Sequence, residues 1–176
     1  MTAVPNYGER LKIGMILASK NTVAEPDAIA MLPGGVALHT TRLRLVDTDP
    51  VALRKMTDDA EAAADLLASA GLGIIVFHCT AASTIDPDMG SKVAERIRRA
   101  TGVPATATSE ALVASLRALK AKKIVLLSPY PQHVNDAEVA FFRHHGIETL
   151  KEAGYLPPEG ESSPYASPEE LSLIHI

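Results

Sequence analysis

Short apolar segments alternate with amphipathic segments along this chain, and this alternation limits its fold more than any other feature. The most apolar segment, residues 72–77, is continuous, as in a parallel strand that is covered on both faces. Strands that alternate with helices form a mostly parallel sheet with right-handed crossovers. The sequence therefore predicts an α/β protein, with strands at residues 12–17, 36–45, 72–79, 122–128 and 147–156.

The segments between the predicted strands have helical periodicity and recognisable ends. In the clearest example Asp49 is the predicted N-cap, Pro50 occupies the first helical position and Gly71 ends the helix. The apolar stripe of this helix consists of Leu53, Met56, Ala60, Ala63, Ala64 and Leu67. Further helices are predicted at residues 86–100, 108–120 and 132–146.

The alternation restarts near Val103–Pro104, which predicts two units. Residues 1–103 are expected to form an N-terminal α/β domain that carries the only cysteine. Residues 104–170 are expected to form a partial second α/β domain, because two clear strands are too few to complete a sheet of their own.

The last residues of the sequence have an unusual composition for a domain end. The segment "SPEEL", residues 167–171, has the proline and the acidic residues of a helix start. The chain then ends in "LSLIHI", which one frame of a common sequencing adapter also encodes. We therefore expect residues 171–176 to be a non-native tail, with a short native apolar tail as the alternative. On this interpretation the 176-residue chain is expected to aggregate and to lack turnover.

Charge and cysteine content exclude several classes of function. The formal net charge is −4 and both signs are interspersed, so no basic block indicates a nucleic-acid partner. The N-terminus has no apolar signal core, and no run of 18 apolar residues predicts a membrane span. One cysteine cannot form a disulfide framework, and the sequence is therefore expected to be that of a soluble cytoplasmic protein.

Three loops that follow predicted strands are rich in hydroxyl and amide side chains: residues 18–27, 78–84 and 128–135. Ligands of open α/β sheets bind at the carboxyl ends of the strands, where these loops meet. Free backbone N–H groups at helix starts suit carboxylates. Cys79 lies in the second loop, and we expect a helix start to lower the pKa of its thiol below the free value, which would make it a nucleophile or a proton carrier.

Each of these residues also has a purely structural interpretation. A lone cysteine at the end of a buried strand is commonly a core residue. Asn21 could be a turn residue and helix cap, and Tyr130 could be a rigid plug between two prolines. His78 is adjacent to Cys79, but neighbours on a strand point to opposite faces, so His78 is expected to be structural.

Three motifs together resemble the aspartate/glutamate racemase superfamily, in the branch of maleate cis–trans isomerases and arylmalonate decarboxylases. They are "IGMILASKNTVAEPD", "FHCTAAST" and "VLLSPYPQHVNDAEVAFFRHHGIE", and the resemblance extends over residues 11–171. It implies two pseudo-symmetric, flavodoxin-like parallel-sheet units with the active site between them, the second unit being incomplete here. It also implies that Cys79 is the first of two catalytic cysteines, that Asn21 and the Thr80 amide bind substrate carboxylate, and that Tyr130 donates a hydrogen bond to the substrate.

The chain departs from the family pattern in ways that leave the subfamily open. The second cysteine is absent, Lys20 stands where a small hydroxyl residue is usual, and Glu159-Gly160 replaces an Asp-Asn pair of maleate isomerases. Arylmalonate decarboxylases, in turn, generally lack the first cysteine, which this chain has.

The resemblance implies an isomerase that acts on a small dicarboxylate such as maleate through a cysteine thiolate. An arylmalonate-type decarboxylase and a two-cysteine racemase are the alternatives within the superfamily. A non-catalytic α/β ligand-binding module, or an inactive fragment, is the alternative of another class. No spacing typical of metal ligands appears, and none of the three reactions needs a metal or an organic cofactor. The expected partner is a small carboxylate substrate, and a homo-oligomer of the full-length protein is left open.

Overall fold

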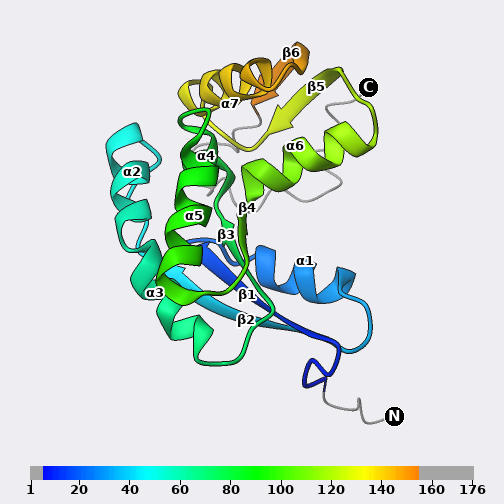
Figure 1. Ribbon diagram of the computed structural model, residues 1–176. Helices are drawn as coiled ribbons and strands as arrows, with labels where there is room; N and C mark the ends of the chain where they lie inside the picture. Colours follow the sequence, from blue (N-terminus) through cyan, green and yellow to red (C-terminus); the bar gives the residue numbers. More distant parts are fainter. Residues whose placement is uncertain (1–5, 155–176) are drawn as a thin grey trace.

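The structure is a computed structural model of the chain and describes residues 6–154 (Figure 1). The predictions for residues 167–176 and for the Glu159-Gly160 pair lie outside the described residues. Within the described range, no helix is both long and apolar enough to cross a membrane.

Four parallel strands form the N-terminal sheet. Their order is β2 (Val36–Leu43), β1 (Leu11–Ala18), β3 (Ile74–His78) and β4 (Ala105–Ala107). The two central strands are the most apolar ones, because helices cover both of their faces: Ile16, Leu17, Ile75 and Phe77 are at most 1% exposed. The predicted fold class, α/β with parallel sheets, is confirmed.

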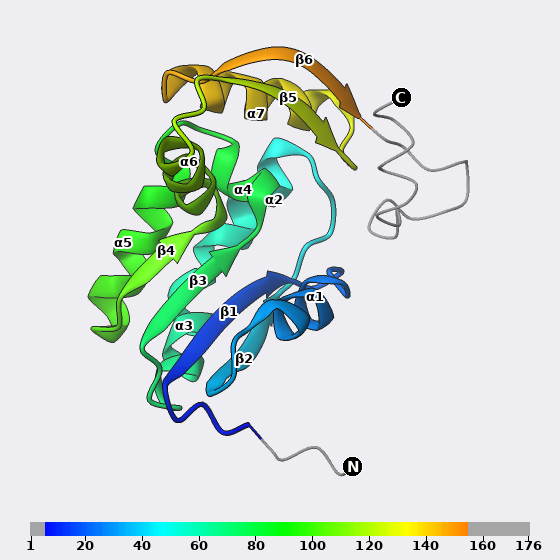
Figure 2. The same ribbon diagram turned by 90° about the vertical axis from the view of Figure 1, so that its right-hand side faces the viewer.

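Helices lie on both faces of this sheet (Figure 2). One face carries α2 (Pro50–Asp58), α3 (Ala60–Ala68) and α5 (Met89–Thr101), and the other face carries α1 (Ala24–Met31). The short helix α4 (Thr80–Thr84) follows β3 directly. The main core lies between the sheet and the first group of helices, while α1 packs on Met15 and Leu17.

The single helix predicted from Pro50 to the residue before Gly71 is wrong. Two helices meet at Asp59, whose backbone angles, φ −91° and ψ 5°, interrupt the helix. The two helices pack against different elements: α2 contacts α4, whereas α3 contacts α5 and the sheet. The predicted N-cap is confirmed: the Asp49 carboxylate accepts hydrogen bonds from the backbone N–H groups of Val51 and Ala52 at 2.8 and 3.1 Å. All six residues of the predicted apolar stripe are buried.

The second unit contains a two-stranded parallel sheet, β5 (Lys123–Ser128) and β6 (Glu148–Gly154), joined by α7 (Gln132–His144). Phe141 and Phe142 of α7 form a separate core with Val113 of α6 (Thr108–Ala118) and with Ile147. The sequence analysis does not predict β4, which pairs with β3 and extends the first sheet past Val103–Pro104. The division into domains stays a prediction.

Helix α7 also connects the two units. Its first turn contacts the loop after β2, where the His133 ring lies 3.1 Å from the carbonyl oxygen of Thr48. At its other end the His145 ring lies 3.3 Å from the carbonyl oxygen of Pro87. Val134 of α7 belongs to the main core of the first unit. The loop between β5 and α7 is thereby held above the carboxyl edge of the first sheet.

Candidate active site

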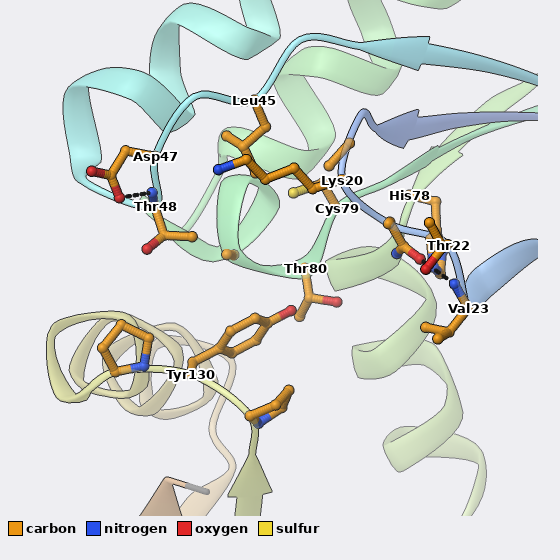
Figure 3. Close-up of a pocket in the computed structure, with 15 residues that line it drawn as sticks. Lys20, Thr22, Val23, Leu45, Asp47, Thr48, His78, Cys79, Thr80 and Tyr130 are labelled. Carbon is orange, nitrogen blue, oxygen red and sulfur yellow. Dashed lines mark hydrogen bonds between the residues drawn. The ribbon is translucent and has the colours of Figure 1, made fainter. Parts of the chain in front are cut away.

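A cavity of about 740 Å³ lies at the carboxyl ends of β1, β2, β3 and β5 (Figure 3). Its walls are four loops that follow these strands, in agreement with the rule that open parallel sheets bind ligands at this edge. The lining residues are Ala18, Lys20, Asn21, Thr22, Val23, Leu45, Asp47, Thr48, His78, Cys79, Thr80, Ala81, Pro129, Tyr130 and Pro131. The four residues predicted for the site, Asn21, Cys79, Thr80 and Tyr130, are all among them.

Cys79 occupies the junction between β3 and α4. Strand β3 ends one residue earlier than predicted, at His78, and Cys79 is the extended residue before the first turn of α4, with φ −149° and ψ 101°. Its carbonyl oxygen accepts a hydrogen bond from the Ser83 N–H at 3.0 Å, which starts the helix. The residue as a whole is half-buried and lines the cavity.

The expectation of a low thiol pKa is wrong for this structure. Burial raises the pKa of the Cys79 thiol to about 11, and a hydrogen bond with the Ala82 backbone, which lowers the pKa, offsets this only in part. Desolvation disfavours the charged thiolate, and one short helix start does not compensate for it. The thiol is therefore protonated near neutral pH.

Asn21 serves as a turn residue and also lines the cavity. Its side-chain oxygen accepts hydrogen bonds from the backbone N–H groups of Val23 and Ala24 at 3.1 and 3.0 Å, at the start of α1. The structural interpretation of Asn21 is thus confirmed. Since the oxygen is used for the cap, the amide nitrogen Nδ2 remains as a donor without a partner within the described part of the chain.

Tyr130 points from the loop after β5 towards Thr80 at the start of α4 (Figure 3). Hydrogen bonds with the Thr80 side chain and the Ala81 backbone hold the phenol oxygen. Burial, and after it the proximity of Cys79 and Glu138, raises the pKa of Tyr130 well above its usual value. The phenol therefore keeps its proton and can act as a donor.

The sequence model of the arylmalonate decarboxylase family matches residues 13–155. The chain belongs to this family. A relative in Geobacillus stearothermophilus, a maleate isomerase, is 27% identical over 154 residues, which cover 80% of this chain and 61% of that enzyme. A maleate isomerase of Nocardia farcinica is 29% identical over 148 residues, which cover 77% of this chain and 58% of that enzyme. The chain thus spans less than two thirds of the length of either relative.

Solved structures agree with the fold of this family member. The maleate isomerase Iso of Pseudomonas putida S16 matches with a TM-score of 0.78 at 24% identity, over 84% of this chain and 64% of that one. A Nocardia farcinica maleate cis–trans isomerase mutant, solved with a covalently bound succinylcysteine intermediate, matches with a TM-score of 0.76 at 22% identity and the same coverage. The resemblance inferred from three sequence motifs is confirmed, and the structural matches establish the fold.

The cavity of this chain also includes residues that the sequence analysis does not assign to it. The loop after β2 contributes Leu45, Asp47 and Thr48. The sequence held a signal for this loop, because the carboxyl end of a further parallel strand is expected at the same edge of the sheet. His78 also lines the cavity, because the chain turns directly after it. Burial lowers the pKa of His78, so its imidazole is neutral. Across residues 6–154, no group of three or more His, Cys, Asp or Glu side chains could hold a metal ion.

Two buried polar side chains beneath the Tyr130 loop are also missed by sequence analysis. Ser128, at the end of β5, donates a hydrogen bond to Asn135 of α7 at 2.5 Å and accepts one from the Tyr130 backbone N–H at 3.1 Å. Ser128 is 4% exposed and Asn135 is fully buried. Ser128 and Asn135 are the first and last residues of "SPYPQHVN", which has the composition of an ordinary loop. Only the folded chain reveals that these two side chains fix the backbone of Tyr130.

Proposed function

We propose that this site catalyses the cofactor-independent cis–trans isomerisation of a small dicarboxylate such as maleate, with Cys79 as the reacting group. The observation that carries the proposal is that the only cysteine of the chain shares one cavity with three neutral donors, those of Asn21, Thr80 and Tyr130. The relatives named maleate isomerase support the substrate. The succinylcysteine intermediate of the Nocardia farcinica enzyme supports covalent addition by a cysteine.

The Cys79 thiol has to lose its proton as the sulfur attacks, because the thiolate is the nucleophile. The Cys79 sulfur forms a bond with one alkene carbon, and the thiol proton ends on the other, so the π bond is lost and a succinyl thioether remains. The former double bond can now rotate. Elimination removes the same two groups, restores the thiol and leaves the trans isomer, fumarate. No oxidant, reductant or further reactant is needed for the balance.

The neutral donors have a defined role in this proposal. Addition of sulfur places negative charge on the neighbouring carboxylate as an enediolate, and fixed donors stabilise charge that develops in the transition state. The Asn21 amide nitrogen is oriented by the cap that its oxygen makes. The first N–H groups of a helix have no partner within the helix, which makes the Thr80 amide available. The protonated Tyr130 phenol completes the set.

Decarboxylation of an arylmalonate is the second candidate, because the matching family model carries that description. Val23, Leu45 and Pro129 give the cavity apolar walls that suit an aryl group. In this reaction carbon dioxide leaves, and the Cys79 thiol gives its proton to the resulting enediolate. No thioether forms in this reaction, so only the isomerisation passes through a covalent adduct on Cys79.

Intact-mass spectrometry after acid quenching tests the proposal. Incubation with maleate should add the mass of one maleic acid to the chain, and peptide mapping should locate the addition at Cys79. The Cys79→Ser variant should remain unmodified. Proton NMR of the same samples measures turnover, as loss of the vinyl proton signal of maleate and growth of that of fumarate. If Cys79 takes up no maleate while an arylmalonate loses carbon dioxide, the second candidate replaces the first.

A further inference from the structure

The formal charges around the cavity are few. Its lining holds five ionisable side chains, Lys20, Asp47, His78, Cys79 and Tyr130. Burial keeps the imidazole, the thiol and the phenol neutral, as described above. Lys20 is therefore the one cation among the described lining residues and Asp47 the one anion. A dicarboxylate brings two negative charges into this space, whereas the donors assigned so far are all neutral.

Lys20 is held at the cavity mouth by a weak and replaceable partner. Its side chain extends from the turn after β1 to the loop after β2, where Nζ donates a hydrogen bond to the Val46 carbonyl oxygen at 2.8 Å. No ion pair joins Lys20 to Asp47 in the described chain, and the Asp47 carboxylate instead accepts from the Thr48 N–H at 2.6 Å. Two ammonium protons thus remain for a ligand.

Exchange of this partner for a carboxylate is favourable. The bond to Val46 lies in an exposed position and joins a cation to a neutral carbonyl. A carboxylate acceptor adds the Coulombic attraction between two opposite charges to the hydrogen bond, which a neutral carbonyl oxygen does not supply. The backbone of Lys20 does not need to move, because Ser19 already fixes this turn to β2 and its loop through its N–H and its hydroxyl.

We propose that Lys20 is the residue that selects doubly charged substrates, by binding the second carboxylate of a dicarboxylate whose first carboxylate is held by the neutral donors. This inference rests on the proposed function and adds the charge requirement to it. The substrate class is then a short dianion, and a substrate in which one carboxylate is an amide is discriminated against.

Protection of the single thiol from alkylation tests this proposal without requiring turnover. The rate at which iodoacetamide modifies Cys79 is measured at about pH 9, with increasing maleate or with maleamate, its monoamide. Lys20→Met removes the charge at similar length and Lys20→Arg keeps it. Lys55→Met is the matched control, since Lys55 is an exposed lysine on α2 that does not line the cavity.

In the wild-type chain, maleate should protect Cys79 at a lower concentration than maleamate. Lys20→Met should raise the half-protecting concentration of maleate about ten- to a hundredfold and leave that of maleamate nearly unchanged. Lys20→Arg and Lys55→Met should resemble the wild type. An unchanged value for maleate in Lys20→Met, or an equal loss for both probes, overturns the role of Lys20 alone. Failure of both probes to protect the wild-type thiol overturns the proposed function itself.

Discussion

At the scale of single residues, Cys79 shows how local and tertiary structure act on the same thiol in opposite directions. Its position before the first turn of α4 is visible in the sequence, and a helix start lowers a thiol pKa. The burial of the thiol is an effect of tertiary structure, because Cys79 packs against the main core together with Leu45 and Tyr130. Desolvation is the larger of the two effects, so the pKa is raised to about 11.

The raised pKa predicts the pH dependence of alkylation. Because only the thiolate reacts with iodoacetamide, the rate should increase about tenfold per pH unit and continue to increase up to about pH 10. Rates from pH 7 to pH 10, measured by mass spectrometry, show whether the thiol titrates within this range, and they report on one thiol because the chain has a single cysteine. A plateau below about pH 8.5, the value for a free thiol, would contradict the burial argument.

At the scale of elements, the β5–α7 connection fixes Tyr130 through the buried pair Ser128 and Asn135. Ser128→Ala removes the bond that Ser128 donates to Asn135 and the bond it accepts from the Tyr130 N–H. Because these groups are buried, the substitution should lower the free energy of unfolding by about 1–3 kcal/mol. Urea denaturation measures this loss.

The matched control for Ser128→Ala is Ser115→Ala, which removes the exposed bond between Ser115 and the Ala111 carbonyl. Its effect on unfolding should stay within about 0.5 kcal/mol. The two-bond arrangement also predicts that the Ser128→Ala variant binds maleate more weakly in the thiol-protection assay, because the Tyr130 backbone is no longer fixed. Equal unfolding free energies for the two variants would show that the Ser128 bonds add nothing.

The same elements show what the sequence could and could not predict. Continuous apolar runs and clear caps predict β1, β3 and β5 and the Asp49 cap, because these signals are local. Helix α1 has no apolar stripe, with Ile29 and Met31 exposed, and β4 has three residues, so neither has a recognisable pattern. The break at Asp59 follows from the different partners of α2 and α3, which no local signal reveals.

The candidate site follows the same division. The meeting of Asn21 and Cys79 could be predicted, since it requires only that the parallel strands β1 and β3 end at one edge. Tyr130 follows β5 of the other sheet, so its place in the cavity depends on the packing of α7 against the first unit. The contribution of the loop after β2 requires the strand order β2-β1-β3-β4, and the protonation of the thiol requires the packing above it. Topology was thus more predictable than electrostatics, because burial depends on contacts between residues far apart in the sequence.

At the scale of the whole molecule, α7 is, with α6, one of the elements through which the two units contact each other, and it carries a buried acid. Glu138 is 3% exposed, and its Oε1 has no hydrogen-bond partner among the described residues. Burial raises the pKa of this carboxyl to about 7. Ionisation of Glu138 therefore opposes the packing of α7, and the stability of the molecule becomes linked to pH.

The direction of this linkage can be stated. With an ordinary pKa of 4.5 in the unfolded chain and about 7 in the folded one, the folded state holds the Glu138 proton more tightly. The contribution of Glu138 to stability is thus fully present below pH 4.5 and is lost as the pH rises to about 7. The loss amounts to at most about 3 kcal/mol.

Glu138→Gln should remove this dependence, so the variant should be more stable than the wild type at about pH 8 and similar to it at about pH 4.5. Urea denaturation at both pH values measures the difference, with Glu9→Gln, an exposed substitution of the same kind, as the control. Parallel pH profiles for the wild type and Glu138→Gln would mean that the carboxylate finds water or a partner when it ionises, and that α7 tolerates the charge.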